Sequence, residues 1–186
     1  MKIIKIIFFF ILISITQAGT QEFRPLVTIN NRIITNYDLL LEIKTLEFLN
    51  NVKIDNKQQP IILQQMINEK IKEIELKNYK LNVNDKLISK KLNLSLQKKN
   101  KLLTNDIRDN IKNKIILQDK WNKLINLKYS QQLYVNTDEI NQIIKSKNLK
   151  EKDREKIISI EKNKKLNIYS KTFFNQIKVK YLVKYL

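Results

Sequence analysis

The chain almost lacks the two residue types that most often interrupt regular structure. Among its 186 residues, Gly19 is the only glycine, and Pro25 and Pro60 are the only prolines. Because glycine and proline mark most turns and helix ends, their scarcity predicts long helices joined by short polar turns. It also excludes the glycine-rich loops that hold the phosphates of nucleotides, so the sequence predicts no ATP or nicotinamide cofactor, and we expect no cofactor at all.

The first 18 residues have the three parts of a secretory signal peptide. Lys2 and Lys5 precede an apolar run over residues 6–15, and small or polar residues lead to Ala18. This run is shorter than the about 20 apolar residues that cross a bilayer, so we expect a signal peptide over 1–18 that is cleaved on export. The mature chain is expected to contain no transmembrane segment. The chain has no cysteine, which excludes disulfides, thiolate metal sites and a lipid-anchored cysteine.

A β-hairpin is predicted close behind the signal peptide. Residues 26–29 are apolar or β-branched, the Asn-Asn pair at 30–31 tolerates the backbone of a tight turn, and residues 32–34 begin a second strand. Either Thr35 or Asn36 can then cap the first helix. Since a two-stranded hairpin is only marginally stable alone, it needs a third strand or a helix packed against it.

Apolar spacing and capping residues predict a series of helices after the hairpin. The expected helices cover residues 36–49, 60–81, 85–91, 106–129 and 137–144, and a last one begins near 153. The helix over 106–129 is expected to be the longest, with Trp121 in the core. Glu69 and Glu73 are expected on the solvent side of the helix over 60–81, and residues 93–101 are either a helical extension or a basic loop.

The end of the chain changes period. Ile177, Val179, Tyr181, Val183 and Tyr185 alternate with residues that are mostly basic, which predicts a strand with an apolar face toward the core. Pairing this strand with the hairpin would remove an unpaired edge from each. The expected fold is therefore mainly α, with a small sheet formed by an N-terminal β-hairpin and a C-terminal strand.

The segment V-T-I-N-N-R-I-I-T-N-Y-D at residues 27–38 resembles the opening of the SurA-type periplasmic chaperones. In that family a short hairpin leads into a helical chaperone module, which a C-terminal helix and strand complete. The resemblance implies a single module over 19–186, in which 19–149 form the hairpin and helices and 150–186 the returning helix and strand. A parvulin isomerase domain normally precedes the returning helix, and here it is missing.

The resemblance implies an ATP-independent periplasmic chaperone that holds unfolded outer-membrane proteins without prolyl isomerase activity. The outer-membrane assembly machinery is a further expected partner. Such a chaperone binds extended segments through apolar and aromatic contacts. Phe48, Tyr79, Tyr129 and Tyr134 lie near predicted helix ends, so they are candidates to line the client groove, although each could equally fill the core.

Two residue types that carry much enzyme chemistry are missing from the chain. Histidine and cysteine do not occur, which excludes serine–histidine and cysteine–histidine nucleophiles and most zinc sites. The parvulin isomerases also use histidines in their active site. We therefore expect no catalytic residue, no metal site and no enzyme activity.

A formal net charge of +18 raises the alternative of a nucleic-acid partner. Only four of the 36 basic residues are arginines, however, although the guanidinium fork is the preferred reader of phosphates and bases. Together with export, this disfavours nucleic acid, and the chaperone is expected to have no nucleic-acid partner. Two alternatives remain beside the chaperone: a basic envelope adaptor that binds anionic lipid or another protein, and a nucleic-acid-binding protein. The net charge also predicts that acidic segments are attracted to the chaperone.

Overall fold

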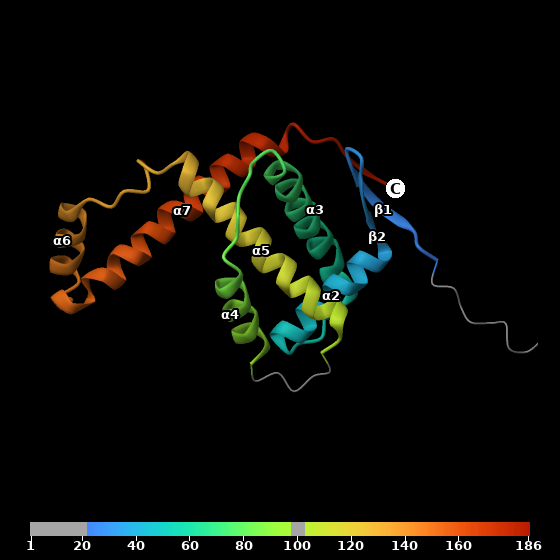
Figure 1. Cartoon of the computed structure of the whole chain (residues 1–186), viewed down its shortest axis with the longest axis horizontal. Coiled ribbons are helices and arrows are strands. Elements are labelled where there is room, and N and C mark those ends of the chain that lie inside the picture. Colours follow the sequence, from blue (N-terminus) through green and yellow to red (C-terminus); the bar gives the residue numbers. More distant parts are fainter. Residues whose placement is uncertain (1–21, 98–102) are drawn as a thin grey trace, which may run out of the picture.

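A computed structural model of the protein describes residues 22–97 and 103–186. The signal peptide expected over 1–18 lies outside the described residues. Within them the fold is mainly helical, with six α-helices and a three-stranded antiparallel sheet (Figure 1), which confirms the expected fold class.

The sheet joins the two ends of the described chain in the order β2-β1-β3. Its strands are β1 (Pro25–Ile29), β2 (Arg32–Thr35) and β3 (Val183–Tyr185). Asn30 turns the hairpin with a positive φ of 48°, which asparagine tolerates better than most residues. The same residue donates its backbone N–H to the carbonyl of Leu182 at 2.9 Å, so the turn itself is tied to the C-terminal tail.

The first helix, α2 (Asn36–Asn50), begins at a reciprocal cap. Thr35 accepts a hydrogen bond from the backbone N–H of Asp38, and the Asp38 side chain accepts one from the backbone N–H of Thr35. This pairing satisfies two amides that the first turn would otherwise leave without partners. The same cap fixes the direction in which the chain leaves the sheet.

The other helices follow in chain order and have boundaries close to those expected from sequence. They are α3 (Gln59–Leu76), α4 (Asp85–Leu96), α5 (Asn105–Lys128), α6 (Thr137–Ser146) and α7 (Arg154–Lys178), with 3₁₀ turns at Asn56–Gln58 and Glu151–Asp153. Three differences appear. The helix α3 ends before residue 81, α4 continues past residue 91 into the segment whose structure the sequence left open, and α7 has 25 residues against 24 in α5, so α5 is not the longest.

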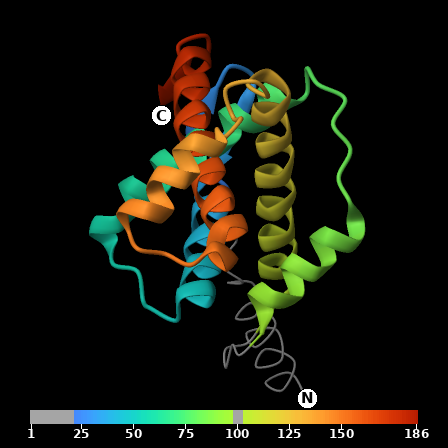
Figure 2. The same ribbon diagram turned by 90° about the vertical axis from the view of Figure 1, so that its left-hand side faces the viewer.

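The main core lies where α3, α5 and the second half of α7 meet the sheet. Trp121 of α5 is fully buried there, as expected, and packs its ring against Phe173 of α7 with the ring centroids 5.5 Å apart. The helix α5 lies between α4 on one side and α7 on the other (Figure 2). The first half of α7 projects from this bundle as an arm, and α6 packs against it (Figure 1).

The C-terminal strand is shorter than the alternating pattern predicted. Ile177 is buried as a residue of α7, one helical turn after Phe173, because the helical spacing of these two side chains places both on the core. The helix therefore continues to Lys178, and Val179 is 79% exposed, so the prediction that Val179 faces the core is wrong. Only residues 183–185 form the strand.

Candidate functional site

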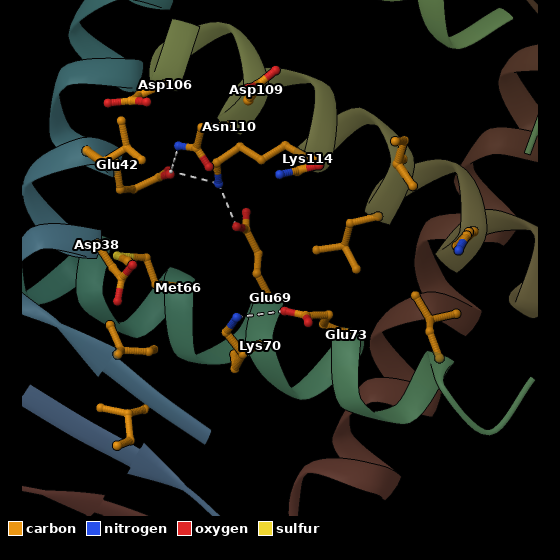
Figure 3. Close-up of a pocket in the computed structure, with 18 of the residues that line it drawn as sticks. Asp38, Glu42, Met66, Glu69, Lys70, Glu73, Asp106, Asp109, Asn110 and Lys114 are labelled. Atoms are coloured by element: carbon orange, nitrogen blue, oxygen red, sulfur yellow. Dashed lines mark hydrogen bonds and ion pairs between the residues drawn. The ribbon is translucent and has the colours of Figure 1, made fainter. Parts of the chain in front are cut away.

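A cleft of about 850 Å³ opens between the sheet and three helices (Figure 3). Strand β2 and helices α2, α3 and α5 each contribute lining residues. Apolar side chains such as Leu41, Met66 and Ile116 share the lining with carboxylates and lysines. The cleft can thus contact both hydrocarbon groups and cationic or N–H donor groups of a bound molecule.

Lys114 joins the walls of the cleft. Its ammonium, on α5, lies 2.9 Å from Glu42 of α2 and 2.5 Å from Glu69 of α3 (Figure 3). Burial of the ammonium opposes its charge, but Glu69 and Glu42 outweigh this effect and raise the pKa of Lys114. Asn110, one turn earlier on α5, donates to Glu42 at 3.1 Å and to the Thr45 hydroxyl at 2.9 Å. These contacts hold three helices at a fixed spacing.

Further polar pairs lie at the rim. Glu73 of α3 forms an ion pair with Lys70 at 2.7 Å. Across the cleft, the Tyr37 hydroxyl donates to Asp106 at 3.1 Å, and this hydrogen bond to a carboxylate raises the pKa of Tyr37. Asp109, on the exposed side of α5, has no ion pair or side-chain hydrogen bond to another described residue. The rim therefore presents carboxylates that are accessible to solvent.

The cleft has the opposite charge balance to the chain as a whole. Acidic residues are half as numerous as basic ones in the sequence, 18 against 36, but they outnumber lysines in the lining. The lining carboxylates are Asp38, Glu42, Glu69, Glu73, Asp106 and Asp109, and the lining lysines are Lys70, Lys77, Lys114 and Lys120. The cleft is therefore a locally acidic site on a strongly basic protein.

A hydrogen-bonded group beside the cleft anchors the C-terminal tail to α3. Glu75, only 8% exposed, accepts a hydrogen bond from Tyr181 at 2.7 Å and a longer one from Tyr79 at 3.4 Å. Burial and the nearby Glu75 carboxylate raise the pKa of Tyr181 well above its ordinary range. Since Tyr79 also lines the cleft, the tail and the cleft share a wall residue.

The four aromatic residues proposed to line a client groove occupy different environments. Tyr79 alone of the four lines the cleft. Phe48 is 3% exposed in a second hydrophobic cluster with α4 and α5, and Tyr129 stacks on Tyr169 with the ring centroids 4.8 Å apart. Tyr134 is 70% exposed beside the arm, where its carbonyl accepts a hydrogen bond from Lys165 of α7. The structure does not bring the four into one surface.

Sequence reasoning missed the charged residues that organise the cleft. Glu69 and Glu73 are partly exposed, as expected, but the side of α3 that carries them faces the cleft. Glu42 was overlooked, although it interrupts the apolar run from residue 39 to residue 43 and thereby signals a buried polar contact. The pairing of Glu42 with Lys114 has no local sequence signal, because the two residues are distant in the chain.

Two other kinds of site, a metal centre and a membrane span, find no support in the described residues, 22–97 and 103–186. Neither histidine nor cysteine occurs, and no three acidic groups there converge as metal ligands would. In the same residues no helix combines the length and apolar character of a membrane span. In comparisons with known proteins, no protein-family model and no curated protein matches the chain.

Proposed function

We propose that the protein is an ATP-independent periplasmic chaperone of the SurA type that holds unfolded outer-membrane proteins and has no isomerase domain. The observation that supports this function best is the open cleft, whose lining mixes apolar and charged side chains. A holding chaperone must bind many extended segments without demanding one sequence, and a surface that offers both kinds of contact suits this task. The resemblance of residues 27–38 to the family's opening supports the same function.

Exposed apolar side chains outside the cleft extend the surface available to a client. Leu127 near the end of α5, Tyr134 before α6 and Ile168 on α7 are each at least 60% exposed. Single exposed apolar residues are common on soluble proteins, so none of them identifies a site alone. In addition to the cleft, they provide secondary contacts for a long unfolded chain.

A holdase assay with a denatured outer-membrane β-barrel, performed at low and at physiological salt, tests this function. The chain from residue 19 should suppress aggregation of the barrel at both salt concentrations. The variant Ile116→Asp, in the cleft lining, should suppress it several-fold less, because a charge replaces an apolar contact. The matched control Leu87→Asp changes a 41% exposed residue of α4 outside the cleft and should act like the wild type.

Each contrary outcome identifies another class of protein. If aggregation proceeds unchanged while the protein binds anionic vesicles, it is a basic envelope adaptor. If it binds an oligonucleotide with steep salt dependence and ignores unfolded protein, it is a nucleic-acid-binding protein. If both variants act like the wild type while aggregation is suppressed, clients are held outside the cleft.

A prolyl isomerase assay on a model peptide should show no acceleration above the uncatalysed rate. The connection from the end of α6 at Ser146 to the start of α7 at Arg154 is too short for an isomerase domain, and the chain has no histidine for parvulin chemistry. An acceleration that a parvulin inhibitor abolishes would contradict this expectation.

A further inference from the structure

The outer edge of β2 has one residue whose backbone faces away from the sheet. Across the hairpin, Val27 lies opposite Ile34, Thr28 opposite Ile33 and Ile29 opposite Arg32. The backbone groups of Asn30 and Leu26 point the other way, to Leu182 and Leu186 beside β3. Hydrogen-bonding direction alternates along an antiparallel strand, so Thr28 also directs its N–H and C=O toward β3. Ile33, which lies opposite Thr28, therefore directs its own N–H and C=O outward. No other described element pairs with this edge.

This outer edge borders the cleft. Ile33 and Ile34 both line the cleft, although neighbouring side chains of a strand point to opposite faces of the sheet. The strand β2, which is an edge strand of the sheet, therefore forms part of the cleft wall. The side chain of Ile33 is 55% exposed, whereas that of Ile34 is 2% exposed and faces the core. An extended chain lying in the cleft would thus pass an unpaired donor and an unpaired acceptor.

The charge of the lining selects the chemistry of such a chain. Lysines that line the cleft are fewer than its carboxylates, and Lys114 is already held by two of them. Glu73 pairs with Lys70 and Lys77 at the rim, but its side chain is still 45% exposed, and Asp109 on the opposite wall is exposed too. A lysine or arginine side chain of a bound segment could form ion pairs with these carboxylates, whereas an aspartate or glutamate side chain would be repelled by them.

We propose that the cleft binds an extended, lysine- or arginine-containing segment of an unfolded polypeptide, which adds as a short strand to the edge of β2 at Ile33 and directs its basic side chain toward the carboxylates of α3 and α5. This inference rests on the proposed chaperone function and specifies its client. It reverses the expectation from net charge, because the local charge of the cleft, and not the total charge of the chain, faces the bound segment.

Fluorescence anisotropy with two labelled peptides tests the selectivity. Both peptides share one alternating apolar frame, and one carries lysines where the other carries glutamates. The lysine peptide should bind more tightly at low and at physiological salt. The double variant Glu73→Gln with Asp109→Asn should weaken its binding by about threefold for each carboxylate removed, the size typical of a partly exposed ion pair. The control Glu155→Gln removes an exposed charge of α7 outside the cleft and should change nothing.

The strand addition is tested by removing the outward amide. Proline is tolerated at an edge position whose N–H makes no ladder bond, so Ile33→Pro should leave the fold intact and weaken the lysine peptide by several-fold. The control Ile33→Val keeps the N–H and should bind as the wild type does. If Ile33→Pro does not fold, a lysine peptide with N-methylated alternate amides provides the measurement with the wild-type protein. Its affinity should fall when the methylated face is the one that pairs.

The outcomes separate this inference from the chaperone function. Tighter binding of the glutamate peptide, or equal binding of both peptides, would overturn the selectivity. The strand addition would be overturned if Ile33→Pro bound the lysine peptide as tightly as the wild type does. It would also be overturned if the wild type bound the N-methylated peptide as tightly as the unmethylated one. Suppression of barrel aggregation would still stand in either case, because clients would then be held elsewhere. Conversely, selective peptide binding without suppression would preserve the site and contradict the holdase function.

Discussion

Lys114 is the residue on which the shape of the cleft depends most. It connects α5 to a buried carboxylate on α2 and a partly exposed one on α3. Glu42, the buried partner, is only 5% exposed, so without the lysine its charge would remain in a poorly solvated place. An isolated buried charge costs much more than a salt bridge contributes, so the energetic weight lies in what the loss of Lys114 would leave behind.

The variant Lys114→Met should therefore destabilise the protein. We expect a loss of about 2 to 4 kcal/mol, toward the lower end because the site is partly solvated. Lys112→Met, an exposed change on the same helix, should stay within about 0.5 kcal/mol of the wild type. The two are compared by urea unfolding. Adding Glu42→Gln to Lys114→Met should restore part of the stability, because Asn110 still has a partner there. Equal effects of the two lysine variants would show that the ion pair has no net value.

Alkaline pH should also destabilise the fold. The pKa values of Tyr181 and Lys114 are both raised in the folded protein, from ordinary values of 10.0 and 10.5. Their stabilising effect is complete below those ordinary values and is lost as the pH rises toward the folded-state pKa, because the unfolded chain releases its protons first. The urea concentration at the unfolding midpoint should be lower at about pH 10.5 than at about pH 8. This decrease should be smaller in Tyr181→Phe. An identical pH dependence in this variant would remove Tyr181 from the explanation.

At the scale of elements, the sheet is the point where the two ends of the chain stabilise each other. Strand β3 pairs only with β1, and its short length is supplemented by the bonds of Asn30 to Leu182. Without β3, strand β1 would pair only with β2, and a two-stranded hairpin is marginal alone. The stability of the N-terminal corner should therefore depend on the last residues of the chain.

Deletion of residues 182–186 should remove hydrogen-exchange protection from particular amides of β1. Thr28 and Asn30 face β3, and Asn30 donates directly to the deleted segment, so their amides should exchange much faster in the truncated protein. Val27 and Ile29, which face β2, should keep more protection. The amide of Ile33 should exchange quickly in the intact protein and in the truncated one, because it faces outward. Strong protection of Ile33 in the intact protein would contradict a free edge on β2.

At the scale of the whole molecule, local sequence signals predicted the elements better than their contacts. The cap at the start of α2 and the Asn-Asn turn were readable because each signal lies within a few residues. The alternation after Ile177 misled because packing against the main core continues α7 through that residue. The cleft was not predictable, since its carboxylates and lysines come from separate elements that are brought together only by the fold.

The arm formed by α6 and the first half of α7 should unfold separately from the bundle. Ile140 of α6 is 1% exposed but belongs to neither of the two core clusters of the described residues, and α6 makes its main contacts with α7. Replacing Ile140 by Asp buries an unpaired charge in that contact and should detach α6. The amides of α6 should then lose hydrogen-exchange protection, whereas Gln142→Asp, an exposed change on the same helix, should leave them protected.

Trp121 allows the bundle to be followed alone in the same experiment. It is the only tryptophan of the chain and lies fully buried in the main core, so its fluorescence reports the bundle and not the arm. In Ile140→Asp the free energy of unfolding measured by Trp121 fluorescence should change by less than about 0.5 kcal/mol, as for distant independent sites. Helix content measured by circular dichroism should fall at lower urea than the tryptophan signal. If both signals instead move together to lower urea, the arm and the bundle form one cooperative unit, and the arm cannot change conformation around a client without loosening the core beneath it.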